Sequence, residues 1–213
     1  MGRVKTFRIH LDPDLIERFN DSLDRHEHIS EQISFVEKAF EKKKYWGVPA
    51  WDCICTCVHR IRDGVAYLNK QELGRMECGS AFDFINFINN TSVVLDCVQM
   101  LADILGVDLS EENSRSAVFN MVGRDGKGTD KKYYEFLRSL CAVHPSGTDR
   151  HRRYQGADMV SCPYLIWTHT SPMPMPSVWG DCDIHAHAFV NEANDWGEDV
   201  CIRIDQVFAY VEY

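Results

Sequence analysis

The residues with the clearest chemical potential lie in the segment RSLCAVHP, residues 138–145. It contains an arginine, Arg138, and a histidine, His144, with five residues between them. Histidine titrates near neutral pH, so it can accept or donate a proton. Arginine remains charged and forks onto phosphate oxygens, which stabilises the charge that grows in a transition state. The pair therefore predicts cleavage of RNA, whose 2′-hydroxyl is a built-in nucleophile, without a metal ion or another cofactor.

A basic segment follows this pair. From Arg138 through Tyr154 the sequence has four arginines and a single acid, Asp149, although the formal net charge of the chain is −9. A generally acidic surface repels nucleic acid, so RNA binding needs a local basic patch of this kind. We expect the arginines to bind phosphates and the tyrosine to stack on an unpaired base. The candidate substrate-binding residues are Arg150, His151, Arg152, Arg153 and Tyr154.

The spacing of Arg138 and His144 resembles the motif of HEPN domains, which are helical bundles with an arginine, four to six residues and then a histidine. The resemblance covers roughly residues 12–145 and leaves the rest of the chain unassigned. It implies a homodimer in which two such pairs meet in a cleft and cut RNA, often as a defence nuclease or as a toxin with an antitoxin partner. Positions six apart on a helix lie on different faces. Pro145 disfavours helical geometry at His144, however, so the ring can turn back toward Arg138.

A non-catalytic role is the alternative for the same residues. In a protein-interaction or regulatory domain, Arg138 and His144 would only brace the end of a helix, and the arginines that follow would form a solvated loop. Such a domain should expose an apolar patch. A nuclease should instead present the pair and the arginine cluster on one concave surface.

A second kind of site is suggested by alternating polar residues near the C-terminus. On a strand, every other residue shares one face, and here these residues are Asp181, Asp183, His185 and His187. Asp183 and the two histidines could hold iron or zinc with open coordination positions. The alternative is a strand whose outer face is merely polar and whose apolar residues turn inward, namely Ile184, Ala186 and Ala188.

Composition and cysteine usage limit the other functions. The 213 residues are 45% hydrophobic, but no apolar run approaches the ~18 residues of a membrane span, and the first residues lack the apolar stretch of a secretory signal. The nine cysteines include no CxxC pair, which favours a reducing compartment and thiols that fill the core. We therefore expect a cytoplasmic protein that does not contact a membrane. Two further segments are expected to be structural. Residues 123–129 should form a plain glycine-rich loop, and Cys53, Cys55 and Cys57 should pack within a helix.

The pattern of apolar residues predicts a mainly helical α+β fold. Helices are expected from Pro13 to about Phe40 with a break near Ser30, and over 51–68, 80–105, 110–120 and 130–143. The third of these should begin with a capping box of Ser80 and Asp83 and stop at Gly106. Strands are expected over 5–11, 160–168, 183–190 and 200–204, followed by a last helix that Asp205 caps. We predict one domain over residues 1–213, with a four- to five-helix, HEPN-like bundle over 12–145 and a small sheet that joins the 5–11 strand to residues 159–213.

Overall fold

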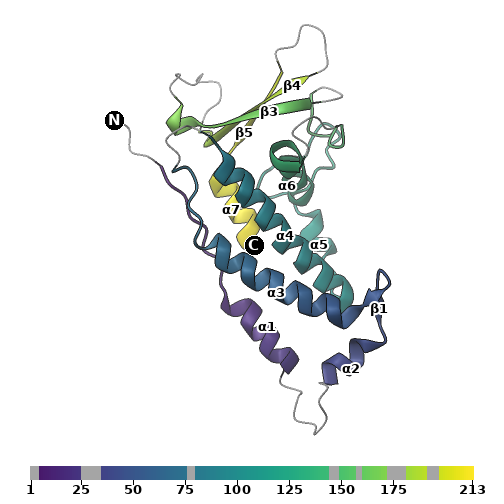
Figure 1. Cartoon of the computed structure of the whole chain (residues 1–213). Coiled ribbons are helices and arrows are strands. Elements are labelled where there is room, and N and C mark those ends of the chain that lie inside the picture. The colour runs from purple at the N-terminus through teal and green to yellow at the C-terminus, as the bar shows by residue number, and fades with distance from the viewer. Residues whose placement is uncertain are drawn as a thin grey trace. The chain divides into compact units, whose positions relative to one another are not determined.

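The computed structural model describes residues 5–24, 35–75, 80–143, 149–156, 160–171, 181–190 and 197–213. These residues contain seven α-helices and two small antiparallel sheets, so the fold class is α+β, as the sequence predicts (Figure 1). The chain divides into two compact units. Unit 1 comprises Met1–Ile9, Gln71–Asn89 and Ser110–Tyr213, and unit 2 comprises His10–Lys70 and Asn90–Leu109. Among the described residues, no helix is long and apolar enough to cross a membrane.

Unit 2 begins with two short helices. α1 (Asp14–Asp24) starts after Asp12, whose carboxylate caps the helix by accepting its first backbone N–H at 2.9 Å. The sequence predicts a helix from Pro13 to about Phe40 with a break, and the structure has a second helix in this range, α2 (Phe35–Glu41). The predicted break near Ser30 lies outside the described residues.

The two longest helices are α3 (Ala50–Leu68) and α4 (Phe82–Leu105). α3 buries the apolar stripe that the sequence predicts, which includes Ile54, Val58, Ile61, Val65 and Leu68. α4 stops at Gly106, as predicted, because this residue adopts the positive φ of 74° that favours glycine. Residues 82–89 of α4 belong to unit 1, and residues 90–105 belong to unit 2.

A two-stranded hairpin between α2 and α3 has no counterpart in the sequence prediction. β1 (Lys44–Tyr45) pairs with β2 (Val48–Pro49). The turn consists of Trp46 with φ 50° and Gly47 with φ 83°, and two positive φ values in a two-residue loop are typical of a type I′ turn. Strands of two residues are too short to produce an alternating pattern, so the sequence could not reveal them.

The C-terminal third forms a three-stranded antiparallel sheet in unit 1. β3 (Val160–Trp167), β4 (Ile184–Val190) and β5 (Glu198–Ile202) lie in this order across the sheet, and α7 (Ile204–Glu212) follows (Figure 1). These elements confirm the three strands and the last helix that the sequence predicts for this region. α5 (Ser110–Ser114), which is shorter than predicted, also belongs to unit 1.

The predicted 5–11 strand is wrong. Within this segment Phe7 forms an isolated bridge with Leu73, in which both N–H···O distances are 3.0 Å. The Leu11 N–H donates to the Asn69 side chain at 2.7 Å, and the Asn69 amide donates to the Leu11 carbonyl at 2.8 Å. Residues after α3 therefore supply hydrogen-bond partners for the backbone of Phe7 and Leu11. The described three-stranded sheet runs β3-β4-β5 and does not include the 5–11 segment.

Trp167, at the end of β3, is the largest fully buried side chain in the part of the chain that the structure describes. Its ring stacks on Phe7 with centroids 5.7 Å apart, and its Nε1–H donates to Asp83 at 2.9 Å. Asp83 also accepts the Gly74 N–H at 2.6 Å, so its carboxylate serves distant contacts in place of the predicted capping box with Ser80. These contacts connect the N-terminal segment, the start of α4 and β3 within unit 1.

Candidate functional site

α6 (Asp130–Arg138) carries the first part of the candidate RNA site. Thr129 caps the helix by accepting the Lys132 N–H at 3.3 Å. Asp130 is 2% exposed, and its carboxylate accepts backbone N–H groups at 2.8–3.0 Å from Ala117, Val118 and Phe119. This anchoring turns the aromatic face of α6 inward and leaves Lys132 and Glu135 exposed.

Residues 149–156 pack on α6 through aromatic rings. The centroid of the Tyr154 ring lies 5.2 Å from that of Tyr133 and 5.5 Å from that of Phe136, and the His151 ring lies 5.9 Å from Phe136. The Tyr154 hydroxyl donates to the Thr129 carbonyl at 3.4 Å, and burial raises the pKa of this phenol. In this structure Tyr154 therefore positions the arginines beside it, and the stacking of a base on its ring stays a prediction.

A pocket of about 600 Å³ is formed by α6, residues 149–154 and part of the glycine-rich loop, and we call it the basic pocket. Its lining contains five cations and three carboxylates, namely Arg124, Lys132, Arg150, Arg152 and Arg153 with Asp125, Glu135 and Asp149. His151 and Tyr154 complete the lining. All five residues that the sequence proposes for substrate binding thus lie at one surface.

Two of the arginines are bound within the wall of the pocket. Arg153 makes a bidentate pair with Asp125 at 2.7 and 2.9 Å, and this guanidinium lowers the pKa of the Asp125 carboxyl to about 2. Arg124 donates to the Gly156 carbonyl at 2.6 Å. Gly123, with φ 69°, makes the close approach possible, because a Cβ there would lie 2.1 Å from Cγ of Arg153. The glycine-rich loop is therefore one wall of the pocket.

The other cations of the basic pocket face solvent. Arg150, Arg152 and Lys132 are exposed, and the Arg152 guanidinium lies 4.0 Å from the Asp149 carboxylate. An exposed pair at this distance contributes little to stability, so Arg152 can exchange it for a phosphate. Sequence reasoning missed Lys132 and Arg124, because only the packing of the loop and the 149–156 turn brings them to the arginine cluster.

Arg138 is the last residue of α6 and is half-buried. The chain continues in a π-helical turn, Ser139–Val143, whose first three residues are buried. Such a turn bonds residue i to i+5, which changes the faces onto which later side chains project. Arg138 does not line the basic pocket, but Glu135, one turn earlier, does. His144 lies outside the described residues, so its approach to Arg138 stays a prediction.

A second group, which we call the His–Asp cluster, lies on β4 and β5. The ligand atoms of His185, His187 and Asp199 lie within 4.8 Å of one another. His185 Nε2 and His187 Nδ1 lie 2.8 and 2.7 Å from the same oxygen, Oδ1 of Asp199. Burial acts to raise the pKa of Asp199, but hydrogen bonds from His187 and His185 outweigh it and lower the pKa. This cluster is the part of the described chain that could hold a metal ion.

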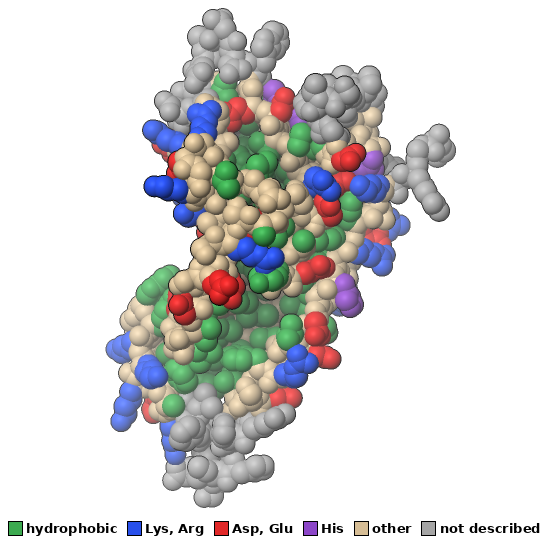
Figure 2. All heavy atoms as spheres, turned by 180° about the vertical axis from the view of Figure 1, so that it is seen from behind, with side chains coloured by type: hydrophobic (Ala, Val, Ile, Leu, Met, Phe, Trp, Pro, Cys, Tyr) green, Lys and Arg blue, Asp and Glu red, His purple; other side chains and the backbone are tan. Residues whose placement is uncertain are grey.

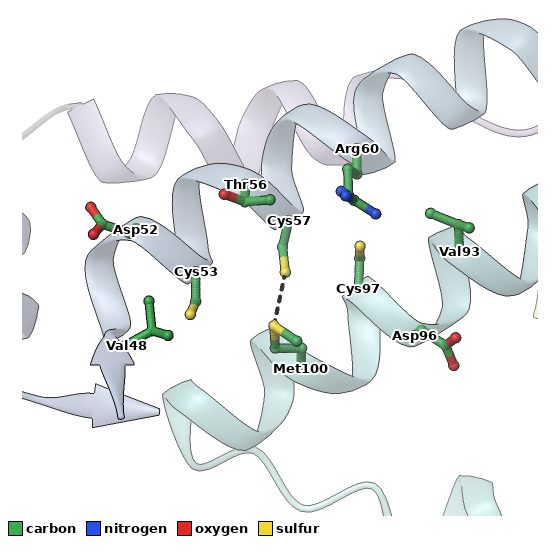
Figure 3. Close-up of a pocket in the computed structure, with 10 residues that line it drawn as sticks. All are labelled: Val48, Asp52, Cys53, Thr56, Cys57, Arg60, Val93, Asp96, Cys97 and Met100. Atoms are coloured by element: carbon green, nitrogen blue, oxygen red, sulfur yellow. Dashed lines mark hydrogen bonds between the residues drawn. The ribbon is translucent and has the colours of Figure 1, made fainter. Parts of the chain in front are cut away.

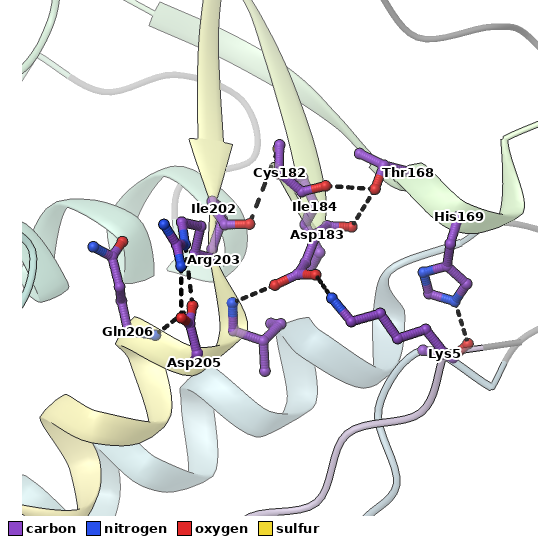
Figure 4. Close-up of polar contacts among 12 residues, drawn as sticks. Lys5, Thr168, His169, Cys182, Asp183, Ile184, Ile202, Arg203, Asp205 and Gln206 are labelled. Carbon is purple, nitrogen blue, oxygen red and sulfur yellow. Dashed lines mark hydrogen bonds and ion pairs between the residues drawn. The ribbon is translucent and has the colours of Figure 1, made fainter. Parts of the chain in front are cut away.

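The carboxylate of this cluster differs from the one that the sequence suggests. Asp183 is buried and caps α7 by accepting the Ile204 N–H at 2.9 Å, a role that the sequence assigns to Asp205. It also pairs with Lys5, so both of its oxygens are in use (Figure 4). The strand register brings Asp199 to the histidines instead. The apolar residues of this strand are buried, as the alternative interpretation predicts, namely Ile184, Ala186 and Ala188.

Unit 2 presents an apolar surface. A pocket of about 420 Å³ between α3 and α4 includes Cys53, Cys57, Cys97 and Met100 in its lining (Figure 3). Burial raises the pKa of the Cys57 thiol to about 12, so it stays protonated and packs as an apolar group. Several large apolar side chains of the unit are exposed, namely Trp46, Val48, Val93, Val98, Leu105 and Val107. Figure 2 shows hydrophobic side chains gathered over one face of these helices.

Comparison with known proteins identifies no family for this chain: no family model matches it, and no curated protein or solved structure gives a significant match. The resemblance to HEPN domains therefore rests on the spacing of Arg138 and His144. The residues of the two sites and the apolar surface are the features of the described chain that bear on its function.

Proposed function

We propose that this protein is a metal-independent ribonuclease of HEPN type. The basic pocket carries the proposal, because a chain with a net charge of −9 lines this pocket of about 600 Å³ with five cations against three carboxylates. A local patch of this kind is what an acidic protein needs in order to bind phosphates. The pocket belongs to the same unit as Arg138, and Glu135 in its lining precedes Arg138 by about one helical turn.

His144 is the general base of the proposed reaction. It removes the proton of the 2′-hydroxyl, and the 2′-oxygen attacks the adjacent phosphorus while Arg138 stabilises the charge on the phosphoryl oxygens. The bond from phosphorus to the 5′-oxygen of the next nucleotide breaks, and this oxygen takes a proton from the protonated His144 of a second copy. The products are a 2′,3′-cyclic phosphate and a 5′-hydroxyl, so the step consumes no cofactor.

The basic pocket binds the strand and leaves the chemistry to the pair. Arg150, Arg152 and Lys132 contact phosphates, whereas Arg153 stays paired with Asp125 and shapes the wall. The proposal includes a homodimer, because proton removal and proton donation each need a histidine. A nuclease that needs no cofactor also has to be restrained in its own cell, so a toxin or defence role with an antitoxin as protein partner belongs to the proposal.

The deciding experiment incubates purified protein with mixed single-stranded RNA in EDTA, alongside His144→Ala and Arg60→Ala. Arg60 is an exposed arginine of α3 outside the basic pocket, so its variant controls for the loss of one positive charge. We expect cleavage with 2′,3′-cyclic phosphate ends by the wild type and Arg60→Ala, and none by a folded His144→Ala. Wild-type protein that cleaves none of several RNAs across a range of pH would contradict the proposal. Cleavage that survives in His144→Ala would point to a different site or a contaminant.

A non-catalytic interaction domain is the second candidate, and the apolar surface of unit 2 favours it. Trp46 is 85% exposed at the tip of the β1-β2 hairpin, with a φ of 50° that is uncommon for a bulky residue. A large exposed ring in a costly conformation is typical of a residue that is kept for a contact. Sedimentation of the wild type and Trp46→Ser tests this candidate. A smaller assembly in the variant, with no RNA cleavage by the wild type, would favour it.

A further inference from the structure

The His–Asp cluster has the composition and the geometry of a metal-ion site. β4 and β5 pair antiparallel with His187 opposite Asp199, and His185 lies two residues from His187, so all three side chains project from one face of the sheet. Side-chain exposure rises from 7% for His185 to 28% for His187 and 39% for Asp199. The cluster is therefore anchored at one end and accessible to an ion from solvent at the other.

We infer that His185, His187 and Asp199 form a site for a divalent transition-metal ion, with Zn²⁺ as the preferred occupant. Two imidazole nitrogens and a carboxylate suit zinc or iron in sites with open positions, whereas Mg²⁺ and Ca²⁺ prefer oxygen ligands alone. A Zn–N distance of about 2.0–2.1 Å places tetrahedral ligand atoms about 3.3 Å apart. The two histidine nitrogens lie 2.8 and 2.7 Å from Asp199 Oδ1. Moving each nitrogen about half an ångström away from Asp199 Oδ1 would give these two pairs the separation that the ion requires, and all three ligand atoms lie within 4.8 Å of one another.

The backbone around the cluster keeps the rings in place. Gly197, with φ 114°, lies against His187, because a Cβ built on this glycine would be 2.8 Å from His187 Nε2. A side chain at this position would push the ring away from Asp199. Without an ion, the Asp199 oxygen accepts an N–H from each ring. The ion takes the place of these two hydrogens, and each neutral ring carries its proton on the other nitrogen.

The proposed ion site is separate from the basic pocket. Glu198 directly precedes Asp199 on β5, so its side chain projects from the opposite face of the sheet. On that face the Glu198 carboxylate lies against Gly156, whose carbonyl binds Arg124 of the basic pocket. The ion therefore links β4 to β5 without contacting RNA, and the inference does not depend on the proposed ribonuclease.

Calorimetric titration of Zn²⁺ into tag-free, EDTA-stripped and reduced protein tests the site. We expect a single equivalent of Zn²⁺ to bind and to raise the melting temperature, and Mg²⁺ not to bind. His187→Ala and Asp199→Asn should each weaken Zn²⁺ binding by at least about 100-fold, because loss of even an outer-shell partner costs roughly 10–100-fold. His59→Ala, which removes an exposed histidine of α3, should leave the affinity unchanged.

Two results would overturn the inference. The first is a wild type that does not bind Zn²⁺. The second is Zn²⁺ binding by both variants that is as tight as in the wild type, because the ion would then belong to some of the nine cysteine thiols. Circular dichroism of each variant separates lost binding from lost fold. Asp199→Asn preserves the shape of the side chain and decides the matter if His187→Ala unfolds. RNA cleavage in EDTA should be equal in both variants and the wild type, so failure of the metal site and failure of the ribonuclease are distinguishable.

Discussion

The basic pocket and the His–Asp cluster lie in the same unit but are built in different ways. Three separate segments supply the cations of the pocket: the loop at 124–125, α6 and residues 149–154. Two neighbouring strands supply the cluster, and their register alone brings its members together. The pocket therefore depends on tertiary contacts, whereas the cluster depends on the backbone ladder of β4 and β5. Exposed cations on loops suit a flexible polymer, whereas an ion needs fixed donor atoms.

The largest expected effect assigns the chemistry to one of the two regions. Arg138→Ala and His144→Ala should each lower the rate of RNA cleavage by about 10²–10⁴, as is typical when a general acid–base group is lost. Loss of a charge that stabilises the transition state has a comparable effect. His187→Ala and EDTA should leave the rate unchanged. Rates on end-labelled RNA measure these effects. An equal loss of rate in His187→Ala, together with a loss in EDTA that Zn²⁺ restores in the wild type, would move the chemistry to the His–Asp cluster.

The next effect tests how far the basic pocket depends on tertiary contacts. Asp130→Ala removes a carboxylate that is 2% exposed and leaves three backbone N–H groups without their acceptor. Because hydrogen bonds to a charged group contribute roughly 1.5–3 kcal/mol each and are not additive, we expect the free energy of unfolding to fall by about 3 kcal/mol. Urea unfolding measures the loss. Asp149→Ala, an exposed carboxylate of the same pocket, is the control and should change stability by less than about 0.5 kcal/mol. A stable Asp130→Ala would show that the pocket has other anchors.

Elements with a regular buried face could be predicted from the sequence. Apolar periodicity of 3.6 or 2 residues predicts α3, α4, α6 and the three C-terminal strands, because each of them buries one side. The prediction of a strand over 5–11 is wrong because alternation alone does not define a strand. The alternation of Phe7, Ile9 and Leu11 is real, but it does not say which partner the backbone takes, and here Asn69 and Leu73 take that place.

The sites show the same division between local pattern and distant pairing. The count of charges predicts that the arginines near Tyr154 share a surface, and alternation predicts that His185 and His187 share a strand face. Asp199 and Arg124 come from other segments and are added by strand register and loop packing. A single sequence does not show which residues of other strands or loops lie beside His185, so the alternation suggests Asp183, whereas strand register brings Asp199 to the histidines.

A smaller effect separates binding from chemistry within the basic pocket. Arg152→Ala should weaken RNA binding and lower the slope of log affinity against log salt by about 0.7 for one lost phosphate contact on a single strand. Fluorescence anisotropy over a salt series measures the slope, with His144→Ala as the background so that the RNA stays intact. Arg60→Ala in the same background is the control. An unchanged slope in Arg152→Ala would remove this residue from the RNA surface.

The smallest expected effect concerns the Asp125–Arg153 pair in the wall of the basic pocket. The guanidinium lowers the pKa of the Asp125 carboxyl from its ordinary 3.8 to about 2. Because the folded pKa lies below the unfolded one, the pair contributes stability above pH 3.8 and loses it as the pH falls toward about 2. Asp125→Asn should therefore melt slightly below the wild type near neutral pH, and the difference should vanish in acid.

Salt provides the control for this last measurement. The Asp125 carboxylate is open to solvent, so added salt should screen the pair and reduce the difference in melting temperature at neutral pH. A difference that persists at pH 2, or that is indifferent to salt, would mean that Asp125 acts through the hydrogen bond that its Oδ1 accepts from the Lys127 backbone N–H and not through its charge. In that case the wall of the basic pocket would be set by the loop itself, and its construction would resemble that of the His–Asp cluster more closely.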